Sequence, residues 1–544
     1  MTAGSDLRAN LGKRLARLGR SAPPLAVLVL LAAILWLGEY ANRGLWEPDE
    51  ARYAYIAREM RETGQWLVPH RFGEIYAHKP PLIFWLINGA SIFTGGRING
   101  LSARLPSLLG AIMTLWALSR LAMRWSGAGT AWLTVFILCT SYLFWHEGGT
   151  GQIDSLLCGL EMTALYFLFR QAERPSLRDQ VISYTLMGFA ILAKGPVGLI
   201  IPLGIFATAQ VVGGKPKTLK GWHWLWGPAW ALCFPAAWLA AAWWNGAPGA
   251  YFHEILFDQN VNRAAGALGH VKPWYYFLVY LPLDFLPWTL LLPAAFMALV
   301  RNPLPWRSTG RLLGWILFPL LFFSLIASKR NIYILPVYPA LAMLLAMALP
   351  HIARLPRKWQ VSSGFLFSSL LLAGGIAGTV AGFLPQWPGS PWTVLPTSLL
   401  LVAGSLLVAT RAHRYGLAGR FPVLAAATLF CAQLATANIL LPAFDSVKTP
   451  HRLADAARST LDPHQPLLIY QMNGEILALY SNRTGERLDS PEALLAKVRK
   501  MEHGIVVMHR HTWKHELSHL RGIGSPHAFQ LGDKKLVWLE FGST

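Results

Sequence analysis

Long apolar runs alternate with short polar stretches from residue 25 to residue 441. A helix of about 20 apolar residues is long enough to cross the hydrocarbon core of a bilayer. The pattern therefore predicts an α-helical polytopic membrane protein with about thirteen transmembrane helices. The predicted spans are 24–42, 103–123, 128–146, 152–169, 180–194, 196–212, 223–245, 274–299, 312–327, 332–350, 361–384, 393–410 and 421–442.

A further apolar run, 81–94, is too short to be counted with them. Its 14 residues rise only about 21 Å as a helix, against about 30 Å of hydrocarbon. We expect this segment to lie flat on the membrane surface.

The distribution of Lys and Arg supports thirteen spans. With a cytoplasmic N-terminus, every turn on the inside is basic, as the positive-inside rule requires. A fourteenth span would place most of these clusters outside. The clusters are Arg8, Lys13, Arg14, Arg17 and Arg20; Arg120 and Arg124; Arg170, Arg174 and Arg178; Lys215, Lys217 and Lys220; Arg301, Arg307 and Arg311; Arg354, Arg357 and Lys358; and Arg411, Arg414 and Arg420.

The tail has a different pattern from the rest of the chain. Strand-like runs at 467–470, 505–508 and 536–541 accompany a run with helical spacing at 491–498. We predict two domains: a transmembrane domain, 1–442, whose first outer loop, 43–102, carries surface helices, and a small α/β domain, 443–544, outside the cytoplasm.

Composition agrees with a membrane protein. The 544 residues are 54% hydrophobic and 14% charged, with a formal net charge of +21. That charge could indicate nucleic acid, but the cations gather in short loops between apolar runs, so membrane lipids are the expected partner and nucleic acid is not. The four cysteines lie in apolar segments and predict no disulfide framework.

The predicted outer loops carry the candidate chemistry. The first contains Glu47, Asp49 and Glu50, followed by three arginines at helical spacing, and either one self-paired amphipathic helix or a functional cluster explains them. Lys79 lies where the chain re-enters the interface. Asp154 begins a span, where a lone carboxylate is costly.

Cations also occur against the positive-inside trend. Lys329 and Arg330 occupy an outer turn just before Tyr333, and a bound phosphate would explain them, because Arg and Lys are its usual partners. Carboxylates and cations thus converge on one membrane face, beside spans able to sheathe a lipid tail. This arrangement favours chemistry on a lipid-linked phosphate.

Five motifs make a specific resemblance: P-D-E-A-R-Y (48–53), Y-A-H-K-P-P (76–81), Q-I-D-S (152–155), A-K-G-P (193–196) and K-R-N-I-Y-I-L-P-V-Y-P (329–339). In order and spacing, the chain resembles the bacterial 4-amino-4-deoxy-L-arabinose (lipid A) transferase family. That family is related to the protein O-mannosyltransferases and has the C-type glycosyltransferase fold. The resemblance covers essentially the whole chain.

The resemblance implies an inner-membrane enzyme that moves aminoarabinose from undecaprenyl phosphate to lipid A on the periplasmic side, with inversion and with no required cofactor. Asp49 would be the catalytic aspartate of the first outer loop, and Asp154 would be the second catalytic carboxylate. The phosphate-binding residues would be Arg52, Lys79, Arg263, Lys329 and Tyr333. His78 stands where the family commonly has glutamate, so the sugar and a divalent metal at this point stay open.

Three alternatives remain at this stage. The acceptor of a mannose-type sugar could be a hydroxyl of a protein or another glycan, in which case Asp49 must act as a base. A transporter or flippase for a lipid-linked substrate also fits thirteen spans, although transporters tend to place charges at mid-membrane in repeated halves. The sequence His515-Glu516-Leu517-Ser518-His519 matches the zinc-protease motif, but no third ligand follows it.

Overall fold

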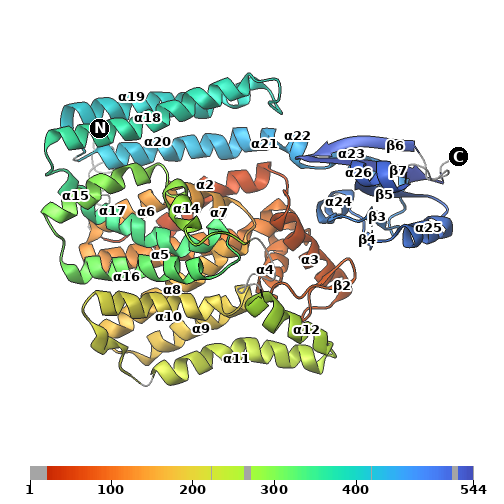
Figure 1. Ribbon diagram of the computed structural model, residues 1–544, viewed down its shortest axis with the longest axis horizontal. Coiled ribbons are helices and arrows are strands. Elements are labelled where there is room, and N and C mark those ends of the chain that lie inside the picture. Colours follow the sequence, from red (N-terminus) through yellow and green to blue (C-terminus); the bar gives the residue numbers. More distant parts are fainter. Residues whose placement is uncertain (1–20, 222, 263–270, 418, 518–524, 543–544) are drawn as a thin grey trace, which may run out of the picture.

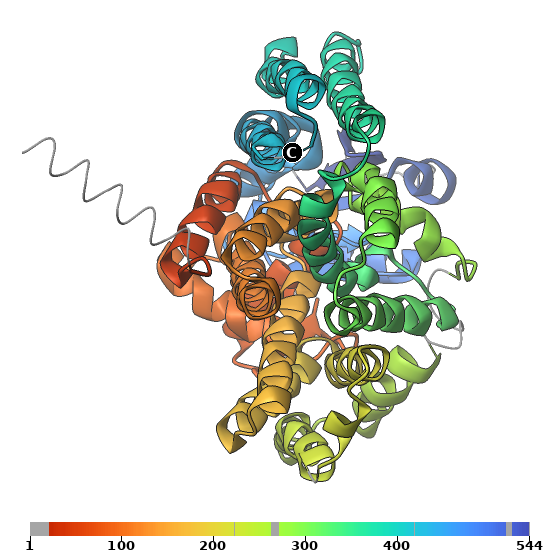
Figure 2. The ribbon, with the colours of Figure 1, turned by 90° about the vertical axis from the view of Figure 1, so that its left-hand side faces the viewer.

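The computed structural model describes residues 21–221, 223–262, 271–417, 419–517 and 525–542. Within these ranges, helices lie side by side in one elongated body, and a smaller domain containing a β-sheet projects from one end of it (Figure 1). Seen end-on, α18 (Arg357–Gly382), α19 (Leu395–Tyr415) and α20 (Phe421–Ala435) form one edge of the body (Figure 2).

Every predicted span coincides with a helix or with a broken helix. The remaining elements are α2 (Leu25–Asn42), α5 (Gly100–Ser126), α6 (Ala128–Cys139) with α7 (Tyr142–Gly149), α8 (Ile153–Glu173), α9 (Leu177–Lys194), α10 (Val197–Val212), α11 (His223–Trp244), α14 (Tyr276–Asp284) with η4 (Trp288–Leu291) and α15 (Leu292–Arg301), α16 (Trp306–Leu325), η5 (Asn331–Val337) with α17 (Tyr338–Ile352), and, after α20, η7 (Thr436–Leu440) with α21 (Leu441–Ala443).

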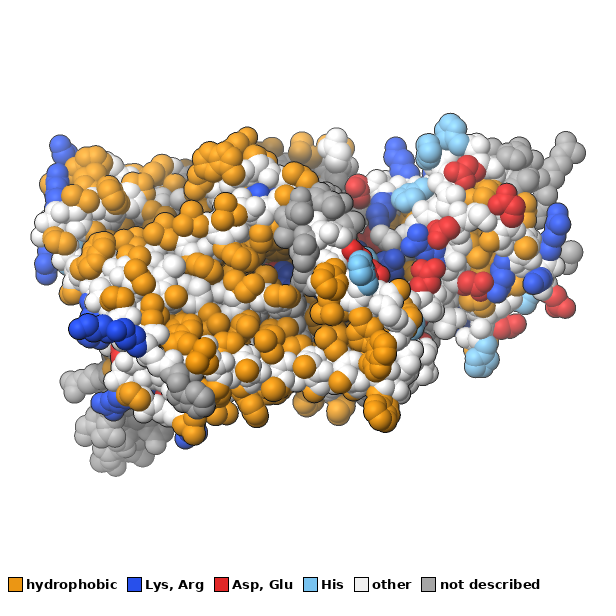
Figure 3. All heavy atoms as spheres, turned by 60° about the horizontal axis from the view of Figure 1, so that its bottom comes forward, with side chains coloured by type: hydrophobic (Ala, Val, Ile, Leu, Met, Phe, Trp, Pro, Cys, Tyr) orange, Lys and Arg blue, Asp and Glu red, His pale blue; other side chains and the backbone are white. Residues whose placement is uncertain are grey.

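In the described part of the chain, eight helices are long and apolar enough to cross a membrane, or ten if each of two bent pairs is one span. The bends are 67° between α6 and α7 and 97° between α14 and the η4–α15 segment. Helix α10 is short, with 16 residues. On the face drawn in Figure 3, hydrophobic side chains are spread over the helical body, Lys and Arg side chains lie at its far end, and side chains of both charges gather over the projecting domain.

Helix α8 lies inside the body and is buried along almost its whole length. It packs very closely against α5, since a Cβ atom on Gly110 would come within 2.2 Å of the Ser155 carbonyl oxygen and one on Gly159 within 2.4 Å of the Gly110 carbonyl oxygen. Only glycine permits this approach. Because α8 faces other helices instead of lipid, it can carry polar residues that a lipid-facing span cannot.

The predicted outer segments form short elements at the end of the body that faces the projecting domain. The run 81–94 is a short apolar helix, α4 (Leu82–Ala90), continued by η1 (Ser91–Thr94), and it packs on α3. The other outer elements are α3 (Asp49–Thr63), β1 (His70–Arg71), β2 (Glu74–Ile75), α12 (Gly249–His253), η3 (Glu254–Asn262) and η6 (Pro391–Thr393). One further short element, η2 (Pro216–Leu219), lies in a predicted inner turn.

The C-terminal domain has a five-stranded sheet in the order β4-β3-β5-β7-β6, parallel at β4-β3-β5 and antiparallel at β5-β7-β6. Its elements are α22 (Asp445–Lys448), α23 (His451–Thr460), β3 (Leu467–Tyr470), α24 (Glu475–Ser481), β4 (Gly485–Leu488), α25 (Pro491–Lys500), β5 (Gly504–His509), α26 (Arg510–Thr512), η8 (Trp513–Leu517), β6 (Ser525–Leu531) and β7 (Lys534–Phe541). The predicted strands match β3, β5 and β7, and the predicted helix matches α25. The two edge strands, β4 and β6, lack a continuous apolar run and were not predicted.

Candidate active site

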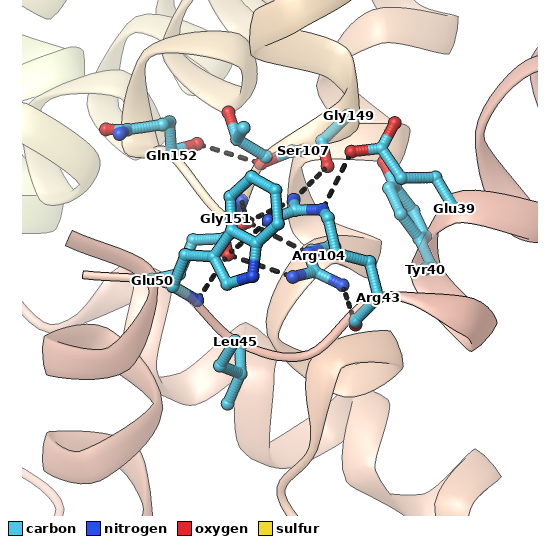
Figure 4. Close-up of polar contacts among 12 residues, drawn as sticks. Glu39, Tyr40, Arg43, Leu45, Glu50, Arg104, Ser107, Gly149, Gly151 and Gln152 are labelled. Carbon is cyan, nitrogen blue, oxygen red and sulfur yellow. Dashed lines mark hydrogen bonds and ion pairs between the residues drawn. The ribbon is translucent and has the colours of Figure 1, made fainter. Parts of the chain in front are cut away.

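Glu50 is the centre of a buried ion-pair network (Figure 4). Its carboxylate accepts hydrogen bonds from Arg104 Nε and Nη2, both at 2.9 Å, and from Arg43 Nη2 at 3.0 Å. The backbone N–H groups of Trp46 and Gly151 also donate to it. Burial raises the pKa of Glu50, but the two guanidinium groups outweigh burial and hold that pKa well below its usual range. Glu50 therefore fastens the first outer loop to α5 and to the turn before α8.

Asp49, the preceding residue, has different partners. It lies buried in the first turn of α3, where Oδ1 is 3.4 Å from Arg52 Nη1 and Oδ2 is 3.0 Å from Arg330 Nη2. Arg330 comes from the turn after α16, 281 residues away in the sequence. Burial opposes the charge of Arg330, but the carboxylates of Asp49 and then Asp154 outweigh it and raise the pKa of the guanidinium. The two predicted acids thus act on the same cation.

The C-terminal domain completes the surroundings of this loop. Glu475 of α24 is 3.6 Å from Arg52 Nε and 3.4 Å from Arg71 Nη1. Glu47 forms an ion pair with Lys534 of β7. Self-pairing within α3 therefore accounts only for the contact between Asp49 and Arg52, because each of the three neighbouring acids also has a partner from a different part of the molecule.

A cavity lies beside this cluster. Lys79, Asp154, Gln259 and Ser328 supply polar groups to its lining, and side chains of α8, α10, α16 and η5 supply apolar walls. Asp154 forms an ion pair with Lys194 at the end of α9, and Lys194 Nζ lies 4.6 Å from the centroid of the Tyr333 ring. A cavity with polar groups and apolar walls suits a lipid that carries a charged head group.

The structure thus brings together most of the predicted site residues. Lys79, Asp154 and Tyr333 line the cavity, and Asp49 and Arg52 belong to the adjacent cluster. Lys329 is placed differently: its ammonium is buried and donates to the backbone carbonyls of Lys272, at 3.1 Å, and Ile326. Arg263 lies outside the described residues.

Three residues near the cavity were not among the site residues predicted from the sequence. Arg330 lies in the turn that was noted for its cations, and Lys194 lies in the A-K-G-P motif. The third, Glu161, is a single acid within an apolar run, which is itself a signal of function inside a membrane.

Two segments of the chain contain potential metal ligands, at His78 and at 515–519. His78 Nε2 is 3.4 Å from Glu254 Oε1, and no group of three His, Cys, Asp or Glu side chains able to hold a metal is found among the described residues. In the zinc-protease motif, Glu516 accepts a hydrogen bond from the Tyr470 hydroxyl at 3.0 Å. The second histidine of that motif, His519, lies outside the described residues.

Comparison with known proteins gives consistent similarities. Residues 78–241 match the dolichyl-phosphate-mannose-protein mannosyltransferase family. The undecaprenyl phosphate-alpha-4-amino-4-deoxy-L-arabinose arabinosyl transferase of Pectobacterium atrosepticum is 30% identical over 466 residues, which are 81% of this chain and 79% of that protein. The protein of the same name from Pectobacterium carotovorum is 31% identical over 471 residues, with the same coverage.

A solved structure shares the fold. The crystal structure of ArnT from Cupriavidus metallidurans bound to undecaprenyl phosphate superposes with a TM-score of 0.75 at 21% identity, over 95% of this chain and 97% of that one. Its apo form superposes with a TM-score of 0.74. These similarities confirm the resemblance that the motifs indicated: the chain belongs to the family of undecaprenyl phosphate-alpha-4-amino-4-deoxy-L-arabinose arabinosyl transferases.

Proposed function

We propose that this protein transfers 4-amino-4-deoxy-L-arabinose from undecaprenyl phosphate to a phosphate of lipid A. The observation that carries the proposal is the cavity with Lys79 and Asp154 in its lining, next to the Asp49–Arg330 ion pair. The cavity offers an apolar wall for a polyprenyl chain, a cation for its phosphate, and acidic groups beside the reacting carbon. Family membership supplies the sugar and the carrier as the expected substrates.

The topology is part of the proposal. Thirteen spans in the inner membrane, with a cytoplasmic N-terminus, would place the cavity, the first outer loop and the C-terminal domain 443–544 in the periplasm. The basic clusters of the inner turns support this orientation. So does the gathering of charged side chains on the C-terminal domain (Figure 3), because such a surface belongs in water.

The reaction is a single displacement. An oxygen of the acceptor phosphate attacks the anomeric carbon, the bond from that carbon to the carrier phosphate oxygen breaks, and undecaprenyl phosphate leaves with the electron pair. The configuration inverts, and no proton needs to move. The leaving group is a stabilised anion, so its departure is assisted by cations at the cavity, Lys79 first among them, and needs no acid.

The contacts of Asp49 favour a phosphate acceptor over a hydroxyl acceptor. Both of its carboxylate oxygens already accept from guanidinium groups, which suits a residue that holds Arg52 and Arg330 in position. A hydroxyl acceptor would need a base to remove its proton, whereas an ionised phosphate does not. In this proposal Asp49 orients the two arginines that draw the acceptor phosphate towards the anomeric carbon.

A direct assay tests the proposal. Purified full-length protein in detergent, given synthetic undecaprenyl phosphate-aminoarabinose and lipid A, should produce lipid A that is heavier by one aminoarabinose residue in mass spectrometry. The assay contains no membrane gradient, so a positive result also excludes a transporter that only moves the lipid. A protein that leaves lipid A unmodified but glycosylates a hydroxyl acceptor would overturn the assignment of the acceptor.

A further inference from the structure

Glu161 has an unusual position. It lies on α8, is fully buried and lines the cavity. Neither of its carboxylate oxygens accepts a hydrogen bond from any described part of the chain. A buried carboxyl group without a hydrogen-bond partner is costly. Such a group inside a membrane protein is a functional candidate, and its place among the cavity-lining residues puts it beside the space that a ligand would enter.

The charged residues of the cavity indicate which kind of ligand it binds. The charged residues among its described lining are Lys79, Lys194, Asp154 and Glu161. Lys194 and Asp154 form an ion pair with each other. In the proposed function, Lys79 contacts the carrier phosphate. Glu161 is then the charged lining residue to which the ligand has to present a cationic group.

The position of Glu161 fits the far side of the donor sugar. It follows Asp154 by seven residues on the same helix, which places it about 10 Å farther along the axis of α8. In the expected donor, the phosphate is attached at C1 and the amine is at C4, across the ring. At neutral pH this head group is a zwitterion, with a negative charge at one end and an ammonium at the other. The cavity presents the opposite charges, because Lys79 and Glu161 both line it.

We propose that Glu161 is a specificity-determining residue that binds the 4-ammonium group of the donor sugar, an inference that rests on the proposed function. The carboxylate accepts a charge-assisted hydrogen bond from the ammonium. This contact selects an amino sugar over the corresponding neutral pentose. It requires no bond to form or break, so Glu161 contributes to donor recognition and not to the displacement itself.

The experiment compares two donors and four proteins. The donors are undecaprenyl phosphate-aminoarabinose and its analogue with a hydroxyl in place of the 4-amine, which has nearly the same shape and no charge. The proteins are wild type, Glu161→Gln, Glu161→Asp and Thr163→Val. Thr163 is the matched control, because it is buried on the same helix but is not among the cavity-lining residues. The rate of transfer to lipid A gives kcat/KM for each donor.

Wild type should prefer the amino donor by roughly ten- to a hundredfold, the value of one charge-assisted contact. Glu161→Gln should lose most of that preference by losing rate on the amino donor, Glu161→Asp should keep part of it, and Thr163→Val should keep all of it. Binding of undecaprenyl phosphate without sugar should survive in Glu161→Gln, which also shows that this variant is folded.

Two results would overturn the inference without affecting the proposed function. One is a wild type that transfers both sugars equally well. This comparison uses wild type alone, so it tests the inference even if Glu161→Gln does not fold. The other is a folded Glu161→Gln that keeps the wild-type preference. Failure of the proposed function itself would look different, because wild type would then transfer neither sugar to lipid A.

Discussion

At the scale of single residues, neighbouring side chains in this protein have unrelated roles. Asp49 and Glu50 are adjacent in the sequence, yet Asp49 pairs with Arg52 and Arg330 beside the cavity. Glu50 is instead enclosed by two arginines, one directly after α2 and one in α5. Lys329 and Arg330 are also adjacent in the sequence and also have different partners. The backbone at Arg330 is extended, and successive side chains of an extended chain point in opposite directions, so Arg330 reaches Asp49 whereas Lys329 turns to backbone carbonyls.

The first residue-scale prediction concerns Asp49. Asp49→Asn should lower the rate of transfer by roughly a hundredfold or more, because both arginines lose the charge that orients them towards the acceptor phosphate. The melting temperature should change little, since Arg330 is a partly exposed partner. Transfer kinetics and thermal unfolding in detergent measure the two effects. Asp455→Asn, an exposed acid on α23, is the control, and full activity of Asp49→Asn would return this residue to a structural role.

Lys79 carries the second residue-scale prediction. A charge-assisted contact to phosphate contributes about 1.5–3 kcal/mol, so Lys79→Ala should weaken undecaprenyl phosphate binding by roughly ten- to a hundredfold. The turnover number should fall too if charge builds on that phosphate in the transition state. Lys79→Arg should recover part of the affinity, because it keeps the charge and changes the geometry.

The Lys79 measurements need a control for total charge. Lys217→Ala removes a cation from a predicted cytoplasmic turn and should bind the lipid like wild type. Wild-type binding and turnover in Lys79→Ala would mean that Lys79 is only an interfacial anchor and that the phosphate site lies elsewhere.

At the scale of elements, the site depends on how α3, α5 and α8 are joined. The close contacts at Gly110 and Gly159 set the distance between α8 and α5. This distance fixes the positions of Asp154 and Glu161, which α8 carries. The Glu50 network fixes the start of α3 on α5 and therefore the direction of Asp49. Glu475 of α24 then joins the C-terminal domain to Arg52 of α3.

Replacing Glu50 should measure how much this network contributes to the stability of the protein. Glu50→Gln leaves two buried arginines without their counter-ion, and breaking a buried pair costs about 3–5 kcal/mol. The ordinary pKa of this carboxyl is 4.5 and folding lowers it, so the stabilisation is present above that pH and is lost as the pH falls below it. The difference in melting temperature between wild type and Glu50→Gln should therefore be large at pH 7 and smaller at pH 4.

Glu47→Gln is the matched control for this element. Glu47 lies three residues away, but its ion pair with Lys534 is partly exposed, and such pairs contribute about 1 kcal/mol or less. A loss of stability as small in Glu50→Gln as in Glu47→Gln would contradict the structural role of the network.

At the scale of the whole molecule, the prediction is the topology. A reporter fused after Gly474, in the C-terminal domain, should be active outside the cytoplasm. One fused after Pro216, in a basic inner turn, should be active inside. The pair of fusions decides between thirteen and fourteen spans, because restoring 81–94 as a span would invert every later segment. The opposite pair of activities would reject the thirteen-span arrangement and the periplasmic position of the cavity.

The sequence by itself determined what depends on local composition. Long apolar runs located the helices, the basic turns predicted their orientation, and short continuous apolar runs located the interior strands β3, β5 and β7, because each of these signals lies within one segment. Motif order identified the family. Only the tertiary structure decided which charged residues meet: Asp49 with Arg330, Asp154 with Lys194, and Glu161 with the cavity. These choices depend on the packing of helices that are distant in the sequence, and no local pattern records the direction in which a side chain points once those helices have packed.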